Sequence, residues 1–398
     1  MLRVAVAGAG AFGRNHLRVY RELETAGQGV ALVAAVDPDA ARAAEAAAKY
    51  AIPVFSSVDE LLSADLNLDA ASVAVPTVHH HAVASQLLDA GIDLLVEKPL
   101  AASLVEADDL IRIAERDRAE KGKLILQPGH LERFNPAVLA VEPKLRRPMF
   151  FEAHRLSVFT QRSLDVDVVL DLMIHDLDIV LNFARSPVRE VRAVGLPILS
   201  PKVDIANVRV EFESGCVANF TASRVSTERV RKLRFFEPRQ YVSIDYARRD
   251  VLVIRVDPGA GKASPAEMIA SLPLKVAAML PPGIADAISS GKIDLAAIDP
   301  AMIAQFAAAA NIDPAVLAQF TGAAESKAGL SFSNPPVTPG EPLRLEVEAF
   351  LDSVRTRRAP RVTARQGRDA LALALEIQSA MATHAHRAGL QDFFQTST

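Results

Sequence analysis

The stretch VAVAGAGAFGRN, near the start of the chain, constrains the fold more than any other feature. Its glycines Gly8, Gly10 and Gly13 have the spacing G-x-G-x-x-G, after an apolar strand-like run and at the start of a helical stretch. In this context the first glycine allows a tight turn, the second lets a pyrophosphate approach the backbone, and the third lets helix and strand pack closely. The pattern favours a dinucleotide-binding βαβ unit over a glycine turn of purely structural use.

Asp37 supports the same interpretation. It follows Gly13 by 24 residues, at the end of the next strand-like run, where a carboxylate can accept a hydrogen bond from a ribose 2′-hydroxyl. A carboxylate there repels a 2′-phosphate, so NAD is the expected cofactor and NADP the less favoured one. Arg14 and Arg42 lie close enough in sequence to weaken that preference. Within the glycine motif, Ala11 and Phe12 are also predicted to line the cofactor site.

Short apolar runs alternate with helical stretches over the first third of the chain. The runs are RVAVAG, VALVAAVD, ASVAVP, DLLVEKP and KLILQPG, separated by stretches rich in Ala, Glu and Arg. This alternation is typical of a parallel sheet buried on both faces, because a crossover helix follows each strand. Residues 1–126 are therefore predicted to form an N-terminal Rossmann domain with a doubly wound parallel sheet.

The pattern then changes. Alternating strand-like runs with turn residues, among them VREVRAVGLP and IANVRVEFESGCVANFTASR, predict an open, mainly antiparallel sheet. Residues 127–257 and 337–398, which end in two amphipathic helices, are assigned to this C-terminal α/β domain. Residues 258–336 are Ala-rich and contain no arginine, and IDPAMIAQF recurs there as IDPAVLAQF, two predicted helix starts. This range is predicted to be a helical insertion.

Composition excludes several classes of function. The 398 residues carry a formal net charge of −4 with a pI near 6.2, which provides no basic surface for nucleic acid. Cys216 is the only cysteine, so no intramolecular disulfide can form, and the N-terminus lacks the features of a signal peptide. No run approaches the roughly 18 apolar residues of a membrane span. We expect a cytoplasmic protein with neither a membrane span nor a nucleic-acid partner.

Lys98 lies at the end of a predicted parallel strand, in the stretch VEKPLA. Such strand ends face the crevice where doubly wound sheets bind ligands. Lys98 could polarise a reacting hydroxyl and Glu97 could orient the lysine, while a surface lysine at a turn is the alternative. The three consecutive histidines of PTVHHH point about 100° apart on a helix and cannot share one ion, so no metal site is predicted.

The run VVLDLMIHDLDIV, residues 168–180, is apolar yet carries three aspartates and a histidine. Buried carboxylates are costly unless they are paired or used. On a helix Asp171, His175 and Asp178 share one face, at i, i+4 and i+7, and Asp176 is turned about 100° from His175. One carboxylate could hold the imidazole so that its other nitrogen acts as a general base. A metal site, or a core histidine with structural aspartates, would also fit this spacing.

In order and spacing these motifs resemble those of the Gfo/Idh/MocA family of NAD(P)-dependent oxidoreductases. The resemblance rests on GAGAFG, PTVHHHAVASQLLDAGIDLLVEKPLA and DLMIHDLDI, and it covers the chain outside 258–336. It implies a second domain whose open sheet face often forms the contact in homodimers or tetramers. It also implies catalytic roles for Lys98, His175 and Asp171. The cofactor site is assigned, in addition to the glycine motif and Asp37, to Pro76, Thr77, His80 and Glu97.

Two further stretches, QPGHLERFNPAV and ASRVSTERVRKLRFFEPRQYVSIDY, are similar to a branch of this family that oxidises the 3-hydroxyl of UDP-N-acetylglucosamine, supplying a 3-amino sugar to lipid A. We therefore expect an NAD-dependent dehydrogenase of a sugar or sugar nucleotide. Arg133, Asn135, Arg155 and Arg162 are predicted to bind the substrate, since guanidinium groups bind phosphate well. The alternatives are another sugar or a non-sugar substrate, or a dinucleotide-binding regulator without turnover.

Overall fold

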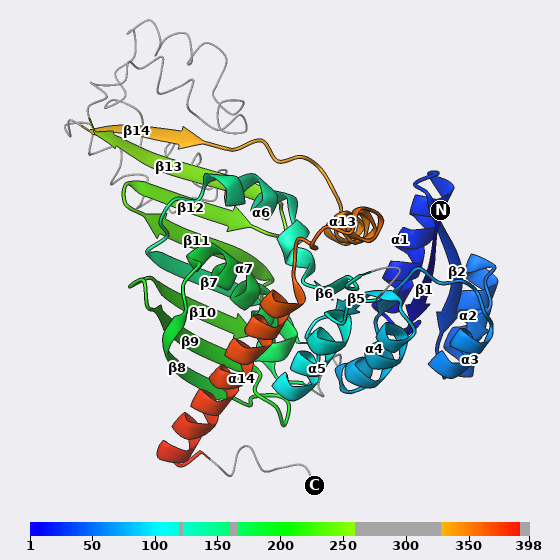
Figure 1. Ribbon diagram of the computed structural model, residues 1–398. Helices are drawn as coiled ribbons and strands as arrows, with labels where there is room; N and C mark the ends of the chain where they lie inside the picture. Colours follow the sequence, from blue (N-terminus) through cyan, green and yellow to red (C-terminus); the bar gives the residue numbers. More distant parts are fainter. Residues whose placement is uncertain (119–121, 160–165, 259–327, 391–398) are drawn as a thin grey trace, which may run out of the picture.

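The computed structural model describes residues 1–118, 122–159, 166–258 and 328–390. Within these residues the chain forms two sheets that lie side by side (Figure 1). The first sheet has six parallel strands in the order β3-β2-β1-β4-β5-β6, and the second has eight strands in the order β14-β13-β12-β11-β7-β10-β9-β8. The predicted fold class, a doubly wound parallel sheet followed by an open, mainly antiparallel one, is confirmed.

The first sheet is buried on both faces. Its strands are β1 (Leu2–Ala7), β2 (Val30–Val36), β3 (Val54–Phe55), β4 (Ala70–Val73), β5 (Asp93–Glu97) and β6 (Leu126–Gly129). Along β1, Val4 and Val6 belong to one buried cluster while Ala5 and Ala7 belong to another, because successive side chains point to opposite faces. The strand order reverses between β1 and β4, and doubly wound sheets bind ligands outside the carboxyl ends of the strands at such a point.

Helices from distant parts of the sequence cover the two faces. One face carries α3 (Val58–Ser63), α4 (His80–Asp89) and α5 (Leu104–Ala114), and the other carries α1 (Gly13–Thr25) and α2 (Ala40–Tyr50). The second face also carries α13 (Pro342–Thr356), which lies beside α1 in Figure 1 and buries Val347 and Phe350 completely. Position along the chain assigned this helix to the second domain, whereas its apolar face packs in the core of the first.

The second sheet is antiparallel except between β7 and β10. Its strands are β7 (Phe150–Leu156), β8 (Val188–Leu196), β9 (Ile205–Phe212), β10 (Val217–Ser223), β11 (Val230–Glu237), β12 (Gln240–Asp245), β13 (Asp250–Pro258) and β14 (Ala328–Ser333). β14 falls within the range 258–336 but pairs with β13, so the end of that range is part of the sheet. The repeated segments, 298–306 and 312–320, lie outside the described residues.

Helices cover one face of the second sheet. Figure 1 shows α6 (Pro136–Val141), α7 (Ile174–Ala184) and α14 (Ala364–Arg387) on this face, where they share a single apolar core with the strands. Among the described residues no helix covers the opposite face. Phe150, Phe236 and Tyr241 form a row of rings there, with centroids 5.5 Å and 5.2 Å apart. None of the described helices is long and apolar enough to cross a membrane.

Candidate active site

The glycine motif forms a tight loop between β1 and α1. Gly8 has a φ of +97°, and a Cβ on it would lie 2.6 Å from the carbonyl oxygen of Ala74. A Cβ on Gly13 would lie 1.8 Å from the carbonyl oxygen of Gly8, so a side chain there would push the helix away from the strand. A Cβ on Gly10 would meet nothing within 4 Å. Backbone conformation and close packing explain Gly8, and close packing explains Gly13, whereas the space beside Gly10 is open to a ligand.

Asp37 directly follows β2 and binds the backbone of this loop. Its carboxylate accepts hydrogen bonds from the backbone amides of Ala9, at 2.8 Å, and Asp39, at 2.9 Å. Nε of Arg42 lies 3.1 Å from both carboxylate oxygens. Burial alone would raise the pKa of Asp37, but the bonds from Arg42 and the two amides outweigh it and lower the pKa. A negative charge is therefore held at the end of β2, with a guanidinium beside it.

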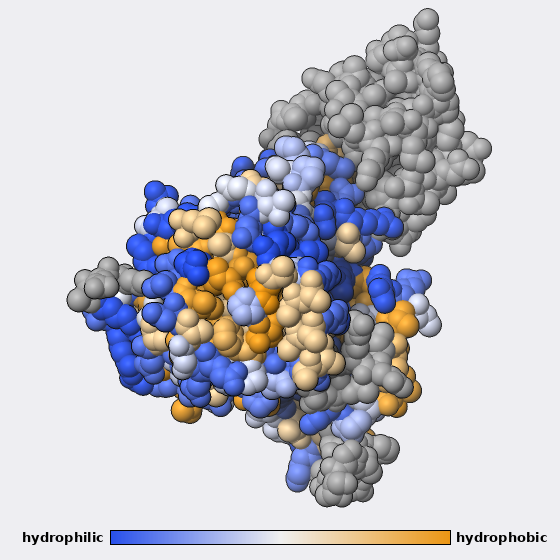
Figure 2. Space-filling model, turned by 90° about the vertical axis from the view of Figure 1, so that its right-hand side faces the viewer, coloured by the Kyte–Doolittle hydropathy of each residue, from blue (hydrophilic) through white to orange (hydrophobic). Residues whose placement is uncertain are grey.

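These residues fit a dinucleotide. The open backbone at Gly10 leads directly into α1, whose N-terminal amides can bind a pyrophosphate, and the charged Asp37 lies where a ribose would follow. Phe12 is 43 % exposed and Ala11 is exposed beside it, so the loop offers apolar surface at the same edge. In Figure 2 the first domain faces the viewer, and an apolar area is surrounded there by hydrophilic surface.

The three consecutive histidines diverge, as their helical spacing predicts. His79 is exposed, and the partly buried His81 places Nε2 3.0 Å from the carboxylate of Asp109. His80 is buried, on a third side of the helix start. Across the described part of the chain, no group of three His, Cys, Asp or Glu side chains is arranged to hold a metal ion.

His80 connects two loops at the carboxyl edge of the first sheet. Its Nδ1 lies 2.8 Å from the carbonyl oxygen of Pro99, and its Nε2 lies 2.9 Å from that of Val75. Pro76 is in the second of these loops, which follows β4, and Thr77 begins the short 3-10 helix η1 (Thr77–His79) that comes next. Burial lowers the pKa of His80, which favours the neutral ring. The structure therefore places His80 inside the protein, where it positions both loops.

Lys98 extends from the end of β5 into the second domain. Its Nζ donates a hydrogen bond of 2.6 Å to the carbonyl oxygen of Asp171 and lies 3.9 Å from that residue's Oδ1. Burial lowers the pKa of Lys98, and the negative charges of Asp171 and Glu97 oppose this effect. The lysine thus joins the ligand-binding edge of the first sheet to the segment that carries His175.

Glu97, which precedes Lys98, belongs to a buried hydrogen-bond chain that the sequence did not predict. Nε2 of His16 is 2.8 Å from Oε1 of Glu97, and Nδ1 of His16 is 3.1 Å from Oγ of Ser72. The hydroxyl of Tyr20 is 2.8 Å from the same Oγ. Glu97 also accepts a 3.3 Å hydrogen bond from the backbone amide of Lys98. Glu97, predicted as a cofactor ligand, is only 6 % exposed and is placed to position Lys98.

A short π-helix, η4 (Val169–Met173), precedes α7 and changes the geometry expected for this run. The spacing argument assumed regular α-helical turns, whereas a π-turn is wider and is frequent at functional sites. Asp171 lies in the π-helix beside Lys98, and His175 is the second residue of α7. Nδ1 of His175 is buried without a hydrogen-bond partner among the described residues. The bond to Asp171 that the i, i+4 spacing suggested is therefore not formed at this nitrogen.

Positive charges surround His175. Burial, followed by the charges of Lys98 and Arg155, lowers the pKa of its imidazole well below the usual value. The ring is consequently neutral at neutral pH, and a neutral imidazole has one nitrogen that can accept a proton. A proton acceptor and the ammonium of Lys98 thus lie together where the two domains meet.

Arg155, on β7, lies beneath this site and is only 3 % exposed. Its Nε and Nη2 lie 2.7 Å and 3.0 Å from the two carboxylate oxygens of Asp176, and its Nη1 lies 3.1 Å from Glu132. Its guanidinium also lies over the ring of Tyr246, 5.1 Å from the centroid. Asp176, which the spacing turned away from the site, ties α7 to the sheet. Arg155 supports the helix that carries His175, and this arrangement argues against direct contact with a substrate phosphate.

Arg133 and Asn135 are also buried, each 2 % exposed. Nη1 of Arg133 lies 3.4 Å from Asp178, so this aspartate pairs with an arginine instead of sharing a site with His175. Nδ2 of Asn135 donates hydrogen bonds to Glu132, at 3.0 Å, and to a backbone carbonyl, at 3.1 Å. The structure places both predicted substrate ligands below the surface. Arg162, the fourth of that set, lies outside the described residues.

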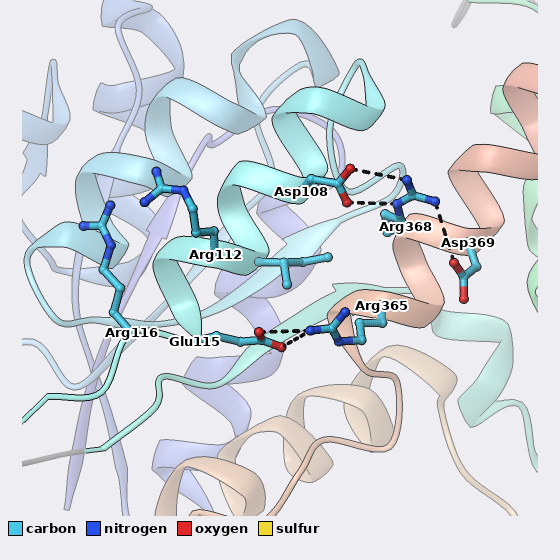
Figure 3. Close-up of a pocket in the computed structure, with 8 residues that line it drawn as sticks. Asp108, Arg112, Glu115, Arg116, Arg365, Arg368 and Asp369 are labelled. Atoms are coloured by element: carbon cyan, nitrogen blue, oxygen red, sulfur yellow. Dashed lines mark hydrogen bonds and ion pairs between the residues drawn. The ribbon is translucent and has the colours of Figure 1, made fainter.

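A separate pocket of about 820 Å³ lies between α5 and α14 (Figure 3). Its charged residues pair across the two helices, Arg368 with Asp108 at 2.9 Å and Arg365 with Glu115 at 2.8 Å. Ion pairs this exposed contribute little to stability, typically about 0–1 kcal/mol. The pocket contains none of the residues predicted for the site.

Comparisons with known proteins agree with this geometry. Residues 2–123 match a family model described as an oxidoreductase family with an NAD-binding Rossmann fold, and residues 137–238 match the GFO/IDH/MocA C-terminal domain. A UDP-N-acetylglucosamine 3-dehydrogenase of Acidithiobacillus ferrooxidans is 39% identical over 246 residues, which are 62% of this chain and 74% of that protein. The chain belongs to the Gfo/Idh/MocA family of oxidoreductases.

A solved structure of an enzyme with that name and a second curated relative show what else this Gfo/Idh/MocA protein is similar to. The solved structure of UDP-N-acetylglucosamine 3-dehydrogenase GnnA from Acidithiobacillus ferrooxidans matches with a TM-score of 0.72 and 30% identity, over 99% of each chain. An inositol 2-dehydrogenase of Acidothermus cellulolyticus is 31% identical over 199 residues, 48% of this chain and 56% of that protein. This Gfo/Idh/MocA protein is thus a dehydrogenase whose N-terminal domain belongs to an NAD-binding type.

Proposed function

We propose that this dehydrogenase uses NAD to oxidise the 3-hydroxyl of UDP-N-acetylglucosamine to a ketone. The observation that carries the proposal is the meeting of a neutral, partly buried His175 and the ammonium of Lys98 between the cofactor domain and the second sheet. The identity to a UDP-N-acetylglucosamine 3-dehydrogenase supports this choice of substrate. A 3-keto sugar nucleotide is the form from which an amino group can be introduced at that carbon, as the lipid A 3-amino-sugar pathway requires.

The side chains divide the work of the reaction. When bound, NAD accepts a hydride from the carbon that carries the reacting hydroxyl. His175 takes the hydroxyl proton as a general base, because its low pKa keeps the ring free of a proton. Lys98 donates a hydrogen bond to the same oxygen and stabilises the negative charge that develops on it. Asp171 positions Lys98, through its carbonyl oxygen at 2.6 Å and its carboxylate at 3.9 Å.

The cofactor site and the assembly are further parts of the proposal. The proposed cofactor site is formed by the glycine motif and by the segment that follows β4. Its residues are Gly8, Gly10, Ala11, Phe12, Gly13, Pro76, Thr77 and His80. In this set His80 is a positioning residue. Asp37 favours NAD because a carboxylate accepts ribose hydroxyls and repels a 2′-phosphate. Arg42, at 3.1 Å from that carboxylate, reduces the preference without reversing it. The uncovered face of the second sheet, with its row of Phe150, Phe236 and Tyr241, is the proposed contact of a homodimer or tetramer.

Turnover of a substrate panel tests the proposal. The full chain is incubated with NAD and, in turn, UDP-N-acetylglucosamine, UDP-glucose, N-acetylglucosamine and myo-inositol, while NADH is followed by absorbance. We expect kcat/KM for UDP-N-acetylglucosamine to exceed the others by at least about 100-fold, which corresponds to about 2.7 kcal/mol of transition-state binding. The Lys98→Met variant is the control: it should bind NAD normally and turn over none of these substrates.

Two outcomes would contradict the proposal. Preferred oxidation of myo-inositol would assign the chain to the activity that its inositol 2-dehydrogenase relatives carry in their names. Tight NAD binding by the wild-type chain without turnover of any member of the panel would favour a non-catalytic, dinucleotide-binding regulator.

A further inference from the structure

We propose that Arg229, directly before β11, and Arg231, the second residue of that strand, form the binding site for the diphosphate of the substrate. This inference rests on the proposed function, since it assigns the part of the site that would distinguish a sugar nucleotide from a free sugar. The sequence had assigned phosphate binding to other arginines, and the two of them that the structure describes, Arg133 and Arg155, are paired with carboxylates.

Three other arginines in the described part of this domain already pair with carboxylates. Arg133, Arg155 and Arg224 are each less than 5 % exposed. Arg224 pairs with Asp204 at 2.7 Å, just as Arg133 pairs with Asp178 and Arg155 with Asp176. A buried guanidinium that already faces a carboxylate has little attraction left for a phosphate. These three residues therefore hold the framework of the site and leave the substrate to other side chains.

The sheet register places Arg231 beside the proposed catalytic histidine. Arg231 and Arg155 are Cα partners in the antiparallel pair of β11 and β7, so their side chains extend from the same face of the sheet. Arg155 binds Asp176, which follows His175 directly in α7. Further along β11, Leu233 and Phe235 share this face and are buried, whereas Arg231 is exposed. Arg231 therefore stands at the rim of the face, at the His175 end of α7.

Arg231 and the charged groups around it together carry a net positive charge. It interacts electrostatically with Arg155, Arg229, Glu132 and Asp176. Both carboxylates are already bonded to Arg155, and neither Arg229 nor Arg231 forms an ion pair in the described ranges of the chain. Like charges that face each other across two strands repel, which destabilises the pair unless an anion lies between them or beside them.

A diphosphate carries the negative charge and the acceptor oxygens that would neutralise this pair of arginines. Two exposed guanidinium groups offer planar, bidentate donors to phosphate oxygens, and such charge-assisted bonds are stronger than neutral ones. A sugar with its reacting hydroxyl at His175 and Lys98 would direct the diphosphate on its anomeric carbon towards this rim. The same arginines would have no partner in inositol or in a free sugar.

Arg234 provides a matched control on the same strand. It lies three residues after Arg231, on the opposite face of the sheet, where its nearest carboxylate oxygen is on Glu152 at 3.9 Å. Removal of Arg234 takes the same charge from β11 without touching the proposed diphosphate site.

The experiment measures the binding of UDP by calorimetry in the presence of saturating NAD, together with kcat and KM for UDP-N-acetylglucosamine. We expect Arg229→Ala and Arg231→Ala each to weaken UDP binding and raise KM by about tenfold or more, with a smaller change in kcat. Arg231→Lys should recover part of the loss, and Arg234→Ala should match the wild type. An unchanged affinity for NAD in every variant shows that the fold is intact.

The outcomes separate this inference from the proposed function. If the wild type binds UDP and the double variant Arg229→Ala, Arg231→Ala binds it equally well, the diphosphate site is elsewhere and only this inference is overturned. If the wild type binds NAD but not UDP, both the sugar-nucleotide substrate and the diphosphate site are overturned.

Discussion

His175 and Lys98 derive their properties from burial and from each other. Both side chains have lowered pKa values, first because burial disfavours their charged forms. The charge of Lys98 then lowers the pKa of His175 further, while Asp171 supports the charged form of the lysine. In the proposed mechanism this pair of neighbours therefore supplies a neutral base and a cationic hydrogen-bond donor, a combination suited to the removal of a hydroxyl proton.

These shifts predict the pH dependence of oxidation. His175 must be unprotonated, and its pKa lies below the ordinary value near 6.5, so kcat/KM should stay constant as pH falls through 6.5 and decline only below it. Lys98 must be protonated, and its lowered pKa places the alkaline decline below the ordinary value near 10.4. A pH series of kcat/KM from roughly 5 to 10 checks both limbs.

The His175→Asn variant tests whether His175 causes the decline of kcat/KM at acid pH, the acid limb of the profile. It should lose the acid limb and about 10²–10⁴-fold in kcat, because a positioned general base contributes about that much. His386→Asn, at an exposed position near the end of α14, should behave as the wild type. An acid limb that persists in His175→Asn, or a wild-type limb at or above pH 6.5, would rule out His175 as the base.

The loop between β1 and α1 separates a glycine needed for folding from a glycine needed for the cofactor. Gly13→Val should lower the free energy of unfolding by about 1–3 kcal/mol or more, because its side chain would meet the backbone of Gly8. Gly10→Val should leave the melting temperature of the cofactor-free protein unchanged and weaken NAD binding by about tenfold or more, because its side chain would enter the space left for the pyrophosphate. Thermal unfolding and NAD titration of both variants test this. Equal losses of stability would refute the distinction.

The elements that the sequence predicted well are those with local causes. The glycine loop, the parallel strands and the antiparallel strands each follow from patterns within about a dozen residues. The partners of the charged residues do not, since His16 bonds Glu97 across 81 positions and Arg133 bonds Asp178 across 45. The π-helix at Val169–Met173 likewise has no local signal, and it contains Asp171, which lies beside Lys98, whereas Asp176 and Asp178 lie in the regular helix α7 and pair with buried arginines.

The C-terminal helices α13 and α14 connect the two domains by packing in their cores. α13 packs in the core of the first sheet, and α14 contributes Leu371 to the first domain and Ile377 to the second. Lys98 and His175 come from different domains, so their relative position depends on this shared core. No short segment of the chain could contain the site, which is why the motifs were informative only in combination.

The uncovered face of the second sheet predicts self-association. Phe236 lies between Phe150 and Tyr241 in a row of partly buried rings, and rows of this kind favour a partner surface. The Phe236→Glu variant should therefore sediment as a smaller species than the wild type at the same concentration. Val105→Glu, at an 80 % exposed position of the first domain, is the control and should sediment as the wild type. Identical sedimentation of Phe236→Glu and the wild type would place the contact elsewhere.

Transfer of deuterium tests the central claim most directly, namely that the chain oxidises carbon 3 of a sugar nucleotide with NAD. UDP-N-acetylglucosamine labelled with deuterium at carbon 3 is incubated with the protein and NAD, and the reduced cofactor is analysed by mass spectrometry. The account predicts that the label appears in the reduced nicotinamide, and that substrate labelled at carbon 4 yields unlabelled cofactor. Unlabelled cofactor from the carbon-3 substrate, or label transferred from carbon 4, would contradict it.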